Sequence, residues 1–316
     1  SCHFRTGQAR SGDSRLCNRV VTITTRSGIK MNVDIDALRK HIGTKIVEHD
    51  VATQAPLRGL AVTFDRQDQI PGPGDPIQPG WHLVYFMPLS PKATLGDDGL
   101  PISGGVLPPM PFPRRMYAGT ELTFHDPIRL GDALKRETEF TDVSLRSGGT
   151  GALIFATQTR RIFTPRGLSI VEQNHTVFRE EVKPGEKSVT PKRNKPPADT
   201  PWRRTITTDP VSLFRYSALT FNPHRIHYDR DYAMRVEGYP GLVVHGPYSQ
   251  QCLIDLARDH APEKTLKSFS QRARAPLFDT APFSVVGRAV DGEKGAELWA
   301  LTPEGTIAME VTIRYA

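Results

Sequence analysis

The chain carries the same series of β-rich segments twice, and this repeat constrains its fold more than any other feature. Each copy has three runs rich in β-branched and aromatic residues, at residues 134–146, 151–163 and 168–180 and again at residues 283–290, 295–302 and 306–316. In both copies a Thr-Pro-X-Gly turn joins the last two runs, at residues 164–167 and 302–305. Pro and Gly are residues that tight turns favour. The repeat predicts an internal duplication in which each half ends in an antiparallel meander.

One helix is predicted ahead of the second meander. It starts at Gly246 and Pro247, which suit the first turn of a helix, and its apolar side chains recur on one stripe, at Tyr248, Cys252 and Leu256. A long antiparallel sheet wrapped on one helix, present twice, is an α+β architecture. We therefore expect two antiparallel sheets, each wrapped on a central helix and paired edge to edge.

Two segments are expected to lie outside the folded halves. Residues 182–200 contain four prolines, five Lys or Arg residues and few apolar side chains, which is typical of a solvated linker. Residues 1–30 carry five arginines and a single acidic residue, Asp13, as in a transit peptide or an upstream extension. The expected domains are residues 31–181 and residues 201–316.

Composition excludes some classes of protein and leaves others open. The sequence has no apolar run near eighteen residues, which excludes a membrane-spanning helix, and its three cysteines are too few for a disulfide framework. The net charge of +7 suits nucleic acid or a small phosphate-bearing ligand. The densest basic run lies in the proline-rich linker without interleaved aromatic residues, which argues against nucleic acid. The expected location is the cytoplasm, with the mitochondrial matrix as the alternative.

Residues 217–233, SALTFNPHRIHYDRDYA, and residues 238–257, GYPGLVVHGPYSQQCLIDLA, carry a family signature. They resemble the MaoC-like, R-specific enoyl-thioester hydratases, which have the hot-dog fold. Residues 104–132 resemble the degenerate first hot-dog of two-domain members, such as the mesaconyl-C4-CoA and itaconyl-CoA hydratases and the type 2 hydroxyacyl-thioester dehydratases. The resemblance implies a double hot-dog hydro-lyase that hydrates a 2-enoyl-CoA reversibly, as a homodimer or a pseudo-dimeric monomer. The sequence has no Walker or Rossmann glycine motif, so no bound redox cofactor is expected, and CoA is part of the substrate.

The resemblance also proposes catalytic residues. It places His227 on the family histidine, Gly246 at the start of the central helix, and Asn222 where the family has a catalytic Asp. Hydration needs a base for water, a proton for Cα and a donor for the thioester oxygen. His227, with its ordinary pKa near neutrality, suits the first two tasks, and the Gly246 N–H suits the third. An amide cannot exchange protons, so Asn222 is expected to orient the water or the ring.

Several alternatives remain open at these positions. Gly246 is equally a plain helix start, Asp229 is either a substrate-binding or a capping residue, and His224 and His245 are interpreted as structural. Metal ligation by His224 and His227 with Asp229 is the weaker alternative, because Arg225 lies between the histidines and no third ligand has convincing spacing.

Arg114 and Arg115 are candidates for binding the substrate. They could hold the second carboxylate of a branched dicarboxylic acyl group, such as mesaconyl or itaconyl, or the phosphates of CoA. The alternative reaction for the same fold is hydrolysis of an acyl-CoA thioester.

Overall fold

A single ten-stranded antiparallel sheet forms the body of the protein. The computed structural model describes residues 20–24, 30–102, 104–148, 151–179 and 194–316. The first half of the chain supplies β3 (Lys45–Val51), β4 (Arg114–Phe124), β5 (Ala133–Gly148), β6 (Gly151–Thr164) and β7 (Gly167–Arg179). The second half supplies β8 (Trp202–Ile206), β9 (Leu266–Ala273), β10 (Phe283–Val290), β11 (Gly295–Leu301) and β12 (Ile307–Tyr315).

The predicted duplication is confirmed by the strand order. Across the sheet the first half runs β3-β5-β6-β7-β4, and the second half runs β8-β10-β11-β12-β9, so both use the chain order 1-3-4-5-2. The two predicted turns join β6 to β7 and β11 to β12. Gly167 and Gly305 close them with φ values of 117° and 75°, which a side chain would strain.

The two halves meet where β4 pairs with β9, and we call this contact the seam. Pairing in the seam runs from Gly119↔Arg272 to Thr123↔Ser268. A Cβ at Gly119 would lie 2.1 Å from the Gln271 carbonyl oxygen, so glycine is required for the strands to approach. The α+β double hot-dog expectation is correct, and the seam is the expected edge-to-edge pairing, which joins the two sheets into one.

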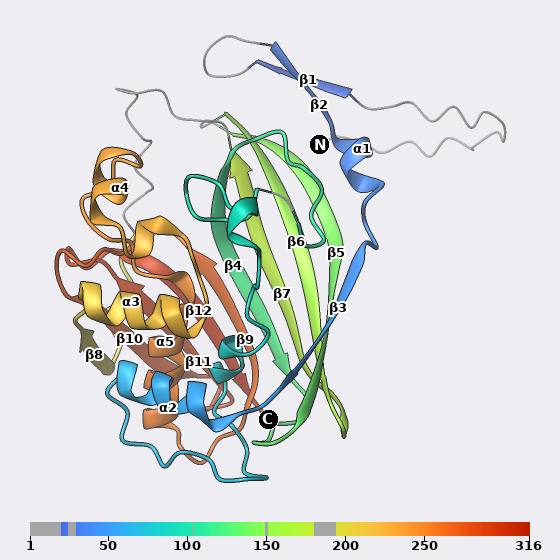
Figure 1. The fold of residues 1–316 in the computed structure, drawn as a ribbon. Coiled ribbons are helices and arrows are strands. Elements are labelled where there is room, and N and C mark those ends of the chain that lie inside the picture. Colours follow the sequence, from blue (N-terminus) through green and yellow to red (C-terminus); the bar gives the residue numbers. More distant parts are fainter. Residues whose placement is uncertain (1–19, 25–29, 103, 149–150, 180–193) are drawn as a thin grey trace, which may run out of the picture.

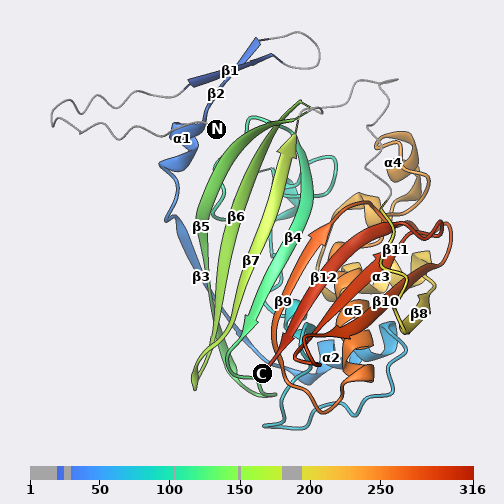
Figure 2. The same cartoon turned by 180° about the vertical axis from the view of Figure 1, so that it is seen from behind.

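The predicted helix is α5 (Gly246–His260), which starts where the sequence indicated. The sequence did not locate four further helices, namely α1 (Ile35–Arg39), α2 (Gln54–Thr63), α3 (Pro210–Leu219) and α4 (Arg230–Arg235). It also did not locate the 3₁₀ turns η1 (Trp81–Val84), η2 (Lys92–Thr94) and η3 (Arg225–His227). Helices α2, α3 and α5 lie on one face of the sheet, and the view from behind shows the strands in front of them (Figures 1 and 2).

The first half has a shorter helical layer than expected. Its place between β3 and β4 holds the ten-residue α2 and η1, whereas the second half has the fifteen-residue α5. Helix α2 packs on α3, since a Cβ at Gly59 would lie 2.4 Å from a Leu219 methyl carbon. The central helix of the first half is thus only partly formed.

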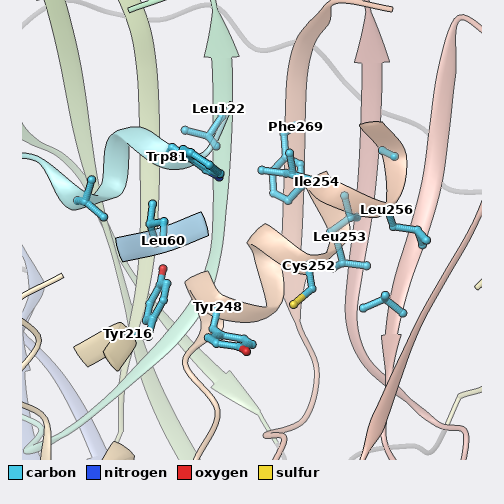
Figure 3. Close-up of a cluster of buried hydrophobic side chains, with 14 of the residues drawn as sticks. Leu60, Trp81, Leu122, Tyr216, Tyr248, Cys252, Leu253, Ile254, Leu256 and Phe269 are labelled. Atoms are coloured by element: carbon cyan, nitrogen blue, oxygen red, sulfur yellow. The ribbon is translucent and has the colours of Figure 1, made fainter. Parts of the chain in front are cut away.

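One hydrophobic core joins both halves. Trp81 and Leu122 of the first half belong to the same buried cluster as Leu253 of α5 and Phe269 of β9. Figure 3 shows Leu253 on α5, with the first-half residues Trp81 and Leu122 to its left. Because burial of large apolar side chains is the main stabilising term, the halves are held together by their shared interior.

The expected terminal extension and linker are described only in part. Residues Val20–Thr24 form β1, which pairs with β2 (Lys30–Asp34) in a separate two-stranded sheet, while residues 1–19 and 25–29 lie outside the described residues. Of the linker, residues 194–200 are described and irregular, and the Asn194 carbonyl accepts a hydrogen bond from Ile307 N–H at 2.8 Å. In the described part of the chain, no helix is long and apolar enough to cross a membrane.

Candidate active site

His227 lies buried in η3, in the loop that follows α3. Its Nδ1 lies 2.7 Å from the Val243 carbonyl oxygen, which can only accept, so Nδ1 carries the proton. The other ring nitrogen, Nε2, is left with a lone pair, as a general base requires. Burial is the main cause that lowers the pKa of His227 to about 3; the hydrogen bond to Val243 opposes the shift and the nearby His224 adds to it. The ordinary pKa of histidine, which lies near neutrality, is thus lowered here by burial that the sequence alone does not reveal.

His245 stacks on His227, and sequence reasoning had treated it as structural. The two ring centroids are 3.7 Å apart and the planes are 18° from parallel, while His224 meets His227 edge-on at 5.5 Å. Ser217 Oγ lies 2.8 Å from His245 Nε2. Burial lowers the pKa of His245 well below its usual value, and the two neighbouring histidines lower it further. The neutral His245 ring thus packs against the His227 ring. Its position directly before Gly246 is the feature of the sequence that could have indicated a place in the site.

Gly246 is the first residue of α5, so its N–H has no acceptor within the helix. A Cβ at this position would lie 3.0 Å and 3.1 Å from two ring carbons of Tyr117, which comes from β4 in the first half. Tyr117 therefore covers the start of α5 across the seam. Sequence reasoning missed Tyr117, because no local pattern shows which strand lies over a helix start.

A buried hydrogen-bond network fixes Tyr117. Thr120 Oγ1 donates to Asn174 Oδ1 at 3.1 Å, so its one proton is committed, and the Tyr117 hydroxyl donates to Thr120 Oγ1 at 2.6 Å. Gln271 Nε2 donates to the Tyr117 hydroxyl at 2.9 Å from the second half. Burial raises the pKa of Tyr117 above its usual value. Tyr117 is thus a neutral wall of the site, held by both halves, and its hydroxyl proton is already used.

Asn222 lies at the turn ahead of His227. Its Oδ1 accepts a hydrogen bond from the His224 backbone N–H at 3.0 Å, and its own N–H donates to the Ser217 carbonyl at 2.8 Å. The side-chain oxygen therefore shapes the loop, and its amide group is the part that remains to orient a water. The catalytic role of Asn222 stays a prediction.

Asp229 takes the capping role that the sequence left open. Its Oδ1 accepts from Tyr232 N–H at 3.0 Å at the start of α4, and its Oδ2 accepts from Arg225 Nη2 at 2.7 Å. These contacts lower the pKa of Asp229, the backbone hydrogen bond most. Both oxygens are used within the protein, which favours capping over substrate binding.

The structure separates Arg114 from Arg115. Arg114 Nη2 lies 3.8 Å from a Glu237 oxygen, so its charge is balanced. Arg115 lies two residues before Tyr117 in β4, and alternate residues of a strand point to the same face. It keeps accessible surface, yet burial is the main cause that lowers its pKa, with Arg160 lowering it further and Asp98 raising it. The Arg115 side chain is nevertheless exposed to solvent.

Arg115 also acts on the histidine cluster. Burial is the main cause that lowers the pKa of His224; Asp98 raises it, and the positive charge of Arg115 lowers it. Arg115 thus interacts electrostatically with His224. Among the described residues, no three His, Cys, Asp or Glu side chains gather in a way that could hold a metal ion.

The site thus combines a neutral imidazole, a helix-start N–H and a cation. Comparison with known proteins places the chain in a family. Residues 80–279 match the model of hydroxyacyl-thioester dehydratase type 2. The chain belongs to this family. The match spans the seam, so this type 2 dehydratase family member is a hydro-lyase built from both halves.

The relatives of the chain agree with this family assignment. A mesaconyl-C4-CoA hydratase of Chloroflexus aurantiacus is 41% identical over 271 residues, which are 85% of this chain and 94% of the relative. The MaoC-like dehydratase from Phytophthora capsici superposes with a TM-score of 0.61 at 16% identity, covering 90% of this chain and 99% of that one. A Mycobacterium tuberculosis protein described as a double hot-dog superposes with a TM-score of 0.55 at 12% identity, covering 87% and 96%. These two structures confirm the double hot-dog fold.

The pH dependence of this dehydratase tests the roles of His227 and Asn222. Asn222 does not titrate, and His227 protonates only near pH 3, so kcat/KM should hold as the pH falls below 6.5. A histidine in the unfolded chain protonates near pH 6.5, whereas burial lowers the pKa of His227 and His245 in the folded protein. The folding stability is therefore fully present above pH 6.5 and is lost as the pH falls below it. Initial rates and the melting temperature should be measured at the same pH values, to separate titration from unfolding.

Two variants extend this pH measurement. Asn222→Asp should raise the His227 pKa by favouring its charged form and move the acidic limb upward. Asn222→Ala should slow the reaction about tenfold, because the water loses its orientation. An Asn222→Ala protein with full rate and an unchanged profile would show that the amide only shapes the loop.

Proposed function

We propose that this enzyme adds water reversibly to the double bond of a 2-enoyl-CoA to give the hydroxyacyl-CoA. The observation that supports this most is the neutral His227, whose Nδ1 proton is committed to Val243 and whose Nε2 is available as a base. It stacks on His245, the residue before Gly246, whose N–H has no acceptor within α5. No other residues are needed for proton transfer and charge stabilisation in this reaction.

The reaction proceeds from these groups as follows. Nε2 of His227 takes a proton from water as the water oxygen bonds to Cβ, and the electron pair of the double bond moves onto the thioester oxygen. The Gly246 N–H and the α5 dipole stabilise that developing enolate. The imidazolium then gives its proton to Cα, which restores the thioester carbonyl and the neutral ring. Stacking on the neutral His245 and burial both disfavour the imidazolium, so it returns the proton readily.

The acyl group is proposed to carry a second carboxylate. The relative named mesaconyl-C4-CoA hydratase suggests a branched dicarboxylic substrate, and the guanidinium of the exposed Arg115 is suited to bind such a carboxylate. A hydrogen-bonded ion pair of this kind gives specificity in addition to affinity.

Two arginine variants test the acyl group. Arg115→Ala should lower kcat/KM for a dicarboxylic enoyl-CoA by about ten- to a hundredfold relative to crotonyl-CoA, because a charged hydrogen bond is lost. Arg114→Ala is the matched control, since Arg114 is balanced by Glu237. Equal losses on both substrates in Arg115→Ala would assign this arginine to the CoA phosphates instead.

A panel of crotonyl-, mesaconyl- and itaconyl-CoA tests the reaction itself. Loss of enoyl absorbance without release of free thiol is the expected result. Thiol release from a saturated acyl-CoA would support the alternative, a thioesterase. We propose that the chain works as a pseudo-dimeric monomer or as a homodimer, in the cytoplasm or the mitochondrial matrix; sedimentation and cell fractionation test these points.

A further inference from the structure

The acceptor of the His227 hydrogen bond lies in an irregular segment between α4 and α5. The Val243 carbonyl oxygen accepts from His227 Nδ1 at 2.7 Å, and the Val243 N–H donates to the Ile226 carbonyl at 3.0 Å. Val243 also forms an isolated antiparallel bridge with Phe278, from the loop between β9 and β10. The position of the Val243 carbonyl is thus set by a short ladder outside the named strands.

A second ladder of the same kind lies in the first half. Pro76 forms an isolated antiparallel bridge with Arg129, from the loop between β4 and β5. In each half two backbone hydrogen bonds flank the bridge in the same arrangement, from N–H to carbonyl: Val244 to Leu277 at 2.8 Å and Asp279 to Leu242 at 3.0 Å, and correspondingly Ile77 to Ile128 at 2.9 Å and Leu130 to Asp75 at 2.9 Å. The two ladders are therefore equivalent by the duplication, and Leu130 stands at the position of Asp279.

The side chains at this shared position have different contacts. Asp279 Oδ1 accepts from the Leu242 N–H at 2.9 Å, and Oδ2 forms an ion pair with Arg230, the first residue of α4. The Asp279 side chain is 1% exposed, against 44% for Arg230. The Leu130 side chain packs in the shared hydrophobic core and accepts no hydrogen bond. Of the two ladders, the one beside His227 is thus the one held by a buried carboxylate.

Gly241 leaves the space that this carboxylate needs. A Cβ at Gly241 would lie 2.7 Å from Asp279 Oδ1 and 3.3 Å from Arg230 Nη1. A buried carboxylate is costly unless it is paired and hydrogen-bonded, so these contacts must be kept together. The carboxylate thereby joins the start of α4, the segment before α5 and the loop between β9 and β10.

Both partners of the His227–Val243 hydrogen bond are tied to this carboxylate. His227 lies three residues before Arg230, and Val243 directly follows Leu242. We propose that Asp279 is a positioning residue for the histidine. Through its two partners it holds the Val243 carbonyl at the place where His227 Nδ1–H donates. The proton then stays on Nδ1 and Nε2 stays free, so the inference rests on the proposed role of His227 as the base.

Asp279→Leu, which introduces the residue of the first half at this position, tests the inference. We expect kcat for the preferred enoyl-CoA to fall about tenfold with KM nearly unchanged, because a displaced base is less well aligned with the water. Asp279→Asn loses the charge but keeps an oxygen for the Leu242 N–H, so it should lose only about threefold.

Nitrogen NMR of the histidine-labelled chain without substrate gives a second readout. The two ring nitrogens differ in shift according to which one carries the proton, and His227→Asn assigns the resonances by their loss. In Asp279→Leu the proton of His227 should move in part from Nδ1 to Nε2, because its acceptor is displaced. Asp279→Asn should show a smaller shift of the same kind.

Asp132→Leu is the matched control. Asp132 Oδ2 accepts from the Arg129 N–H at 2.7 Å and pairs with Arg166 at 2.8 Å, and its side chain is 10% exposed. It makes the same two kinds of contact as Asp279, with partners that both belong to the first half. It should lower the melting temperature, as Asp279→Leu does, and leave kcat and the His227 proton as in the native chain.

Two results in Asp279→Leu would overturn the proposal. One is a native kcat, and the other is a slow variant in which the His227 proton stays on Nδ1. If Asp279→Leu does not fold, a native kcat with an unmoved proton in Asp279→Asn overturns the proposal in the same way. The position of the proton is read without turnover, so its outcome is distinct from a failure of the proposed hydratase activity.

Discussion

His227→Ala is expected to lower kcat for hydration by about a hundredfold to ten-thousandfold, the range of general acid–base contributions. The ring supplies both proton transfers, and no carboxylate stands at Asn222 to replace it. The fold should persist, because the buried neutral ring is replaced by the smaller, apolar side chain of alanine. Steady-state rates on the preferred enoyl-CoA, with circular dichroism as the check on folding, measure the effect.

His227→Asn makes this experiment sharper. The asparagine amide can donate to the Val243 carbonyl in place of Nδ1, yet it cannot act as a base. It should be as slow as the alanine variant, whereas His260→Ala, a change in a histidine that stacks on Trp202 at the far end of α5, should leave the rate nearly unchanged. A His227→Asn protein with half the native activity would remove this residue from the mechanism.

Gly246→Val is expected to lower kcat/KM by about a hundredfold, comparable to the loss of an oxyanion donor. The valine Cβ would lie 3.0 Å from the Tyr117 ring, so either the ring or the start of α5 must shift. A shift of the helix start would move the N–H of residue 246 away from the thioester oxygen. Tyr117→Phe is the control, because it keeps the ring and loses only a hydroxyl whose proton is already used. A native rate for Gly246→Val would return Gly246 to the role of a plain helix start.

Local signals explain which parts of the fold could be predicted. The meanders and α5 have alternating or striped apolar residues with Pro and Gly at their ends. Helix α3 also has a local signal, since Asp209 and Ser212 form a capping box with Pro210 at the first position. It was missed because Val211 and Phe214 are apolar yet exposed, which hides the amphipathic pattern.

The site was predictable where its residues follow one another in the chain. His227 and Gly246 were found from their motifs, but the stacking of His245 on His227 and the cover of Gly246 by Tyr117 join distant segments. Neighbouring residues of a strand point to opposite faces, so Arg114 and Arg115 would have been separated if the sequence had shown where β4 begins. The lowered pKa of His227 depends on burial by the assembled halves, which no spacing encodes.

The seam also bears on how the protein resists self-association. Two separate five-stranded sheets would leave four edge strands open to pairing with other chains, whereas the merged sheet leaves only β3 and β8. Both carry charged side chains, with Lys45, Glu48 and Asp50 on β3 and Arg203 and Arg204 on β8. Fusion of the halves therefore reduces the number of edge strands at risk of aggregation. The charged side chains of β3 and β8 oppose the approach of another strand at the two edges that remain.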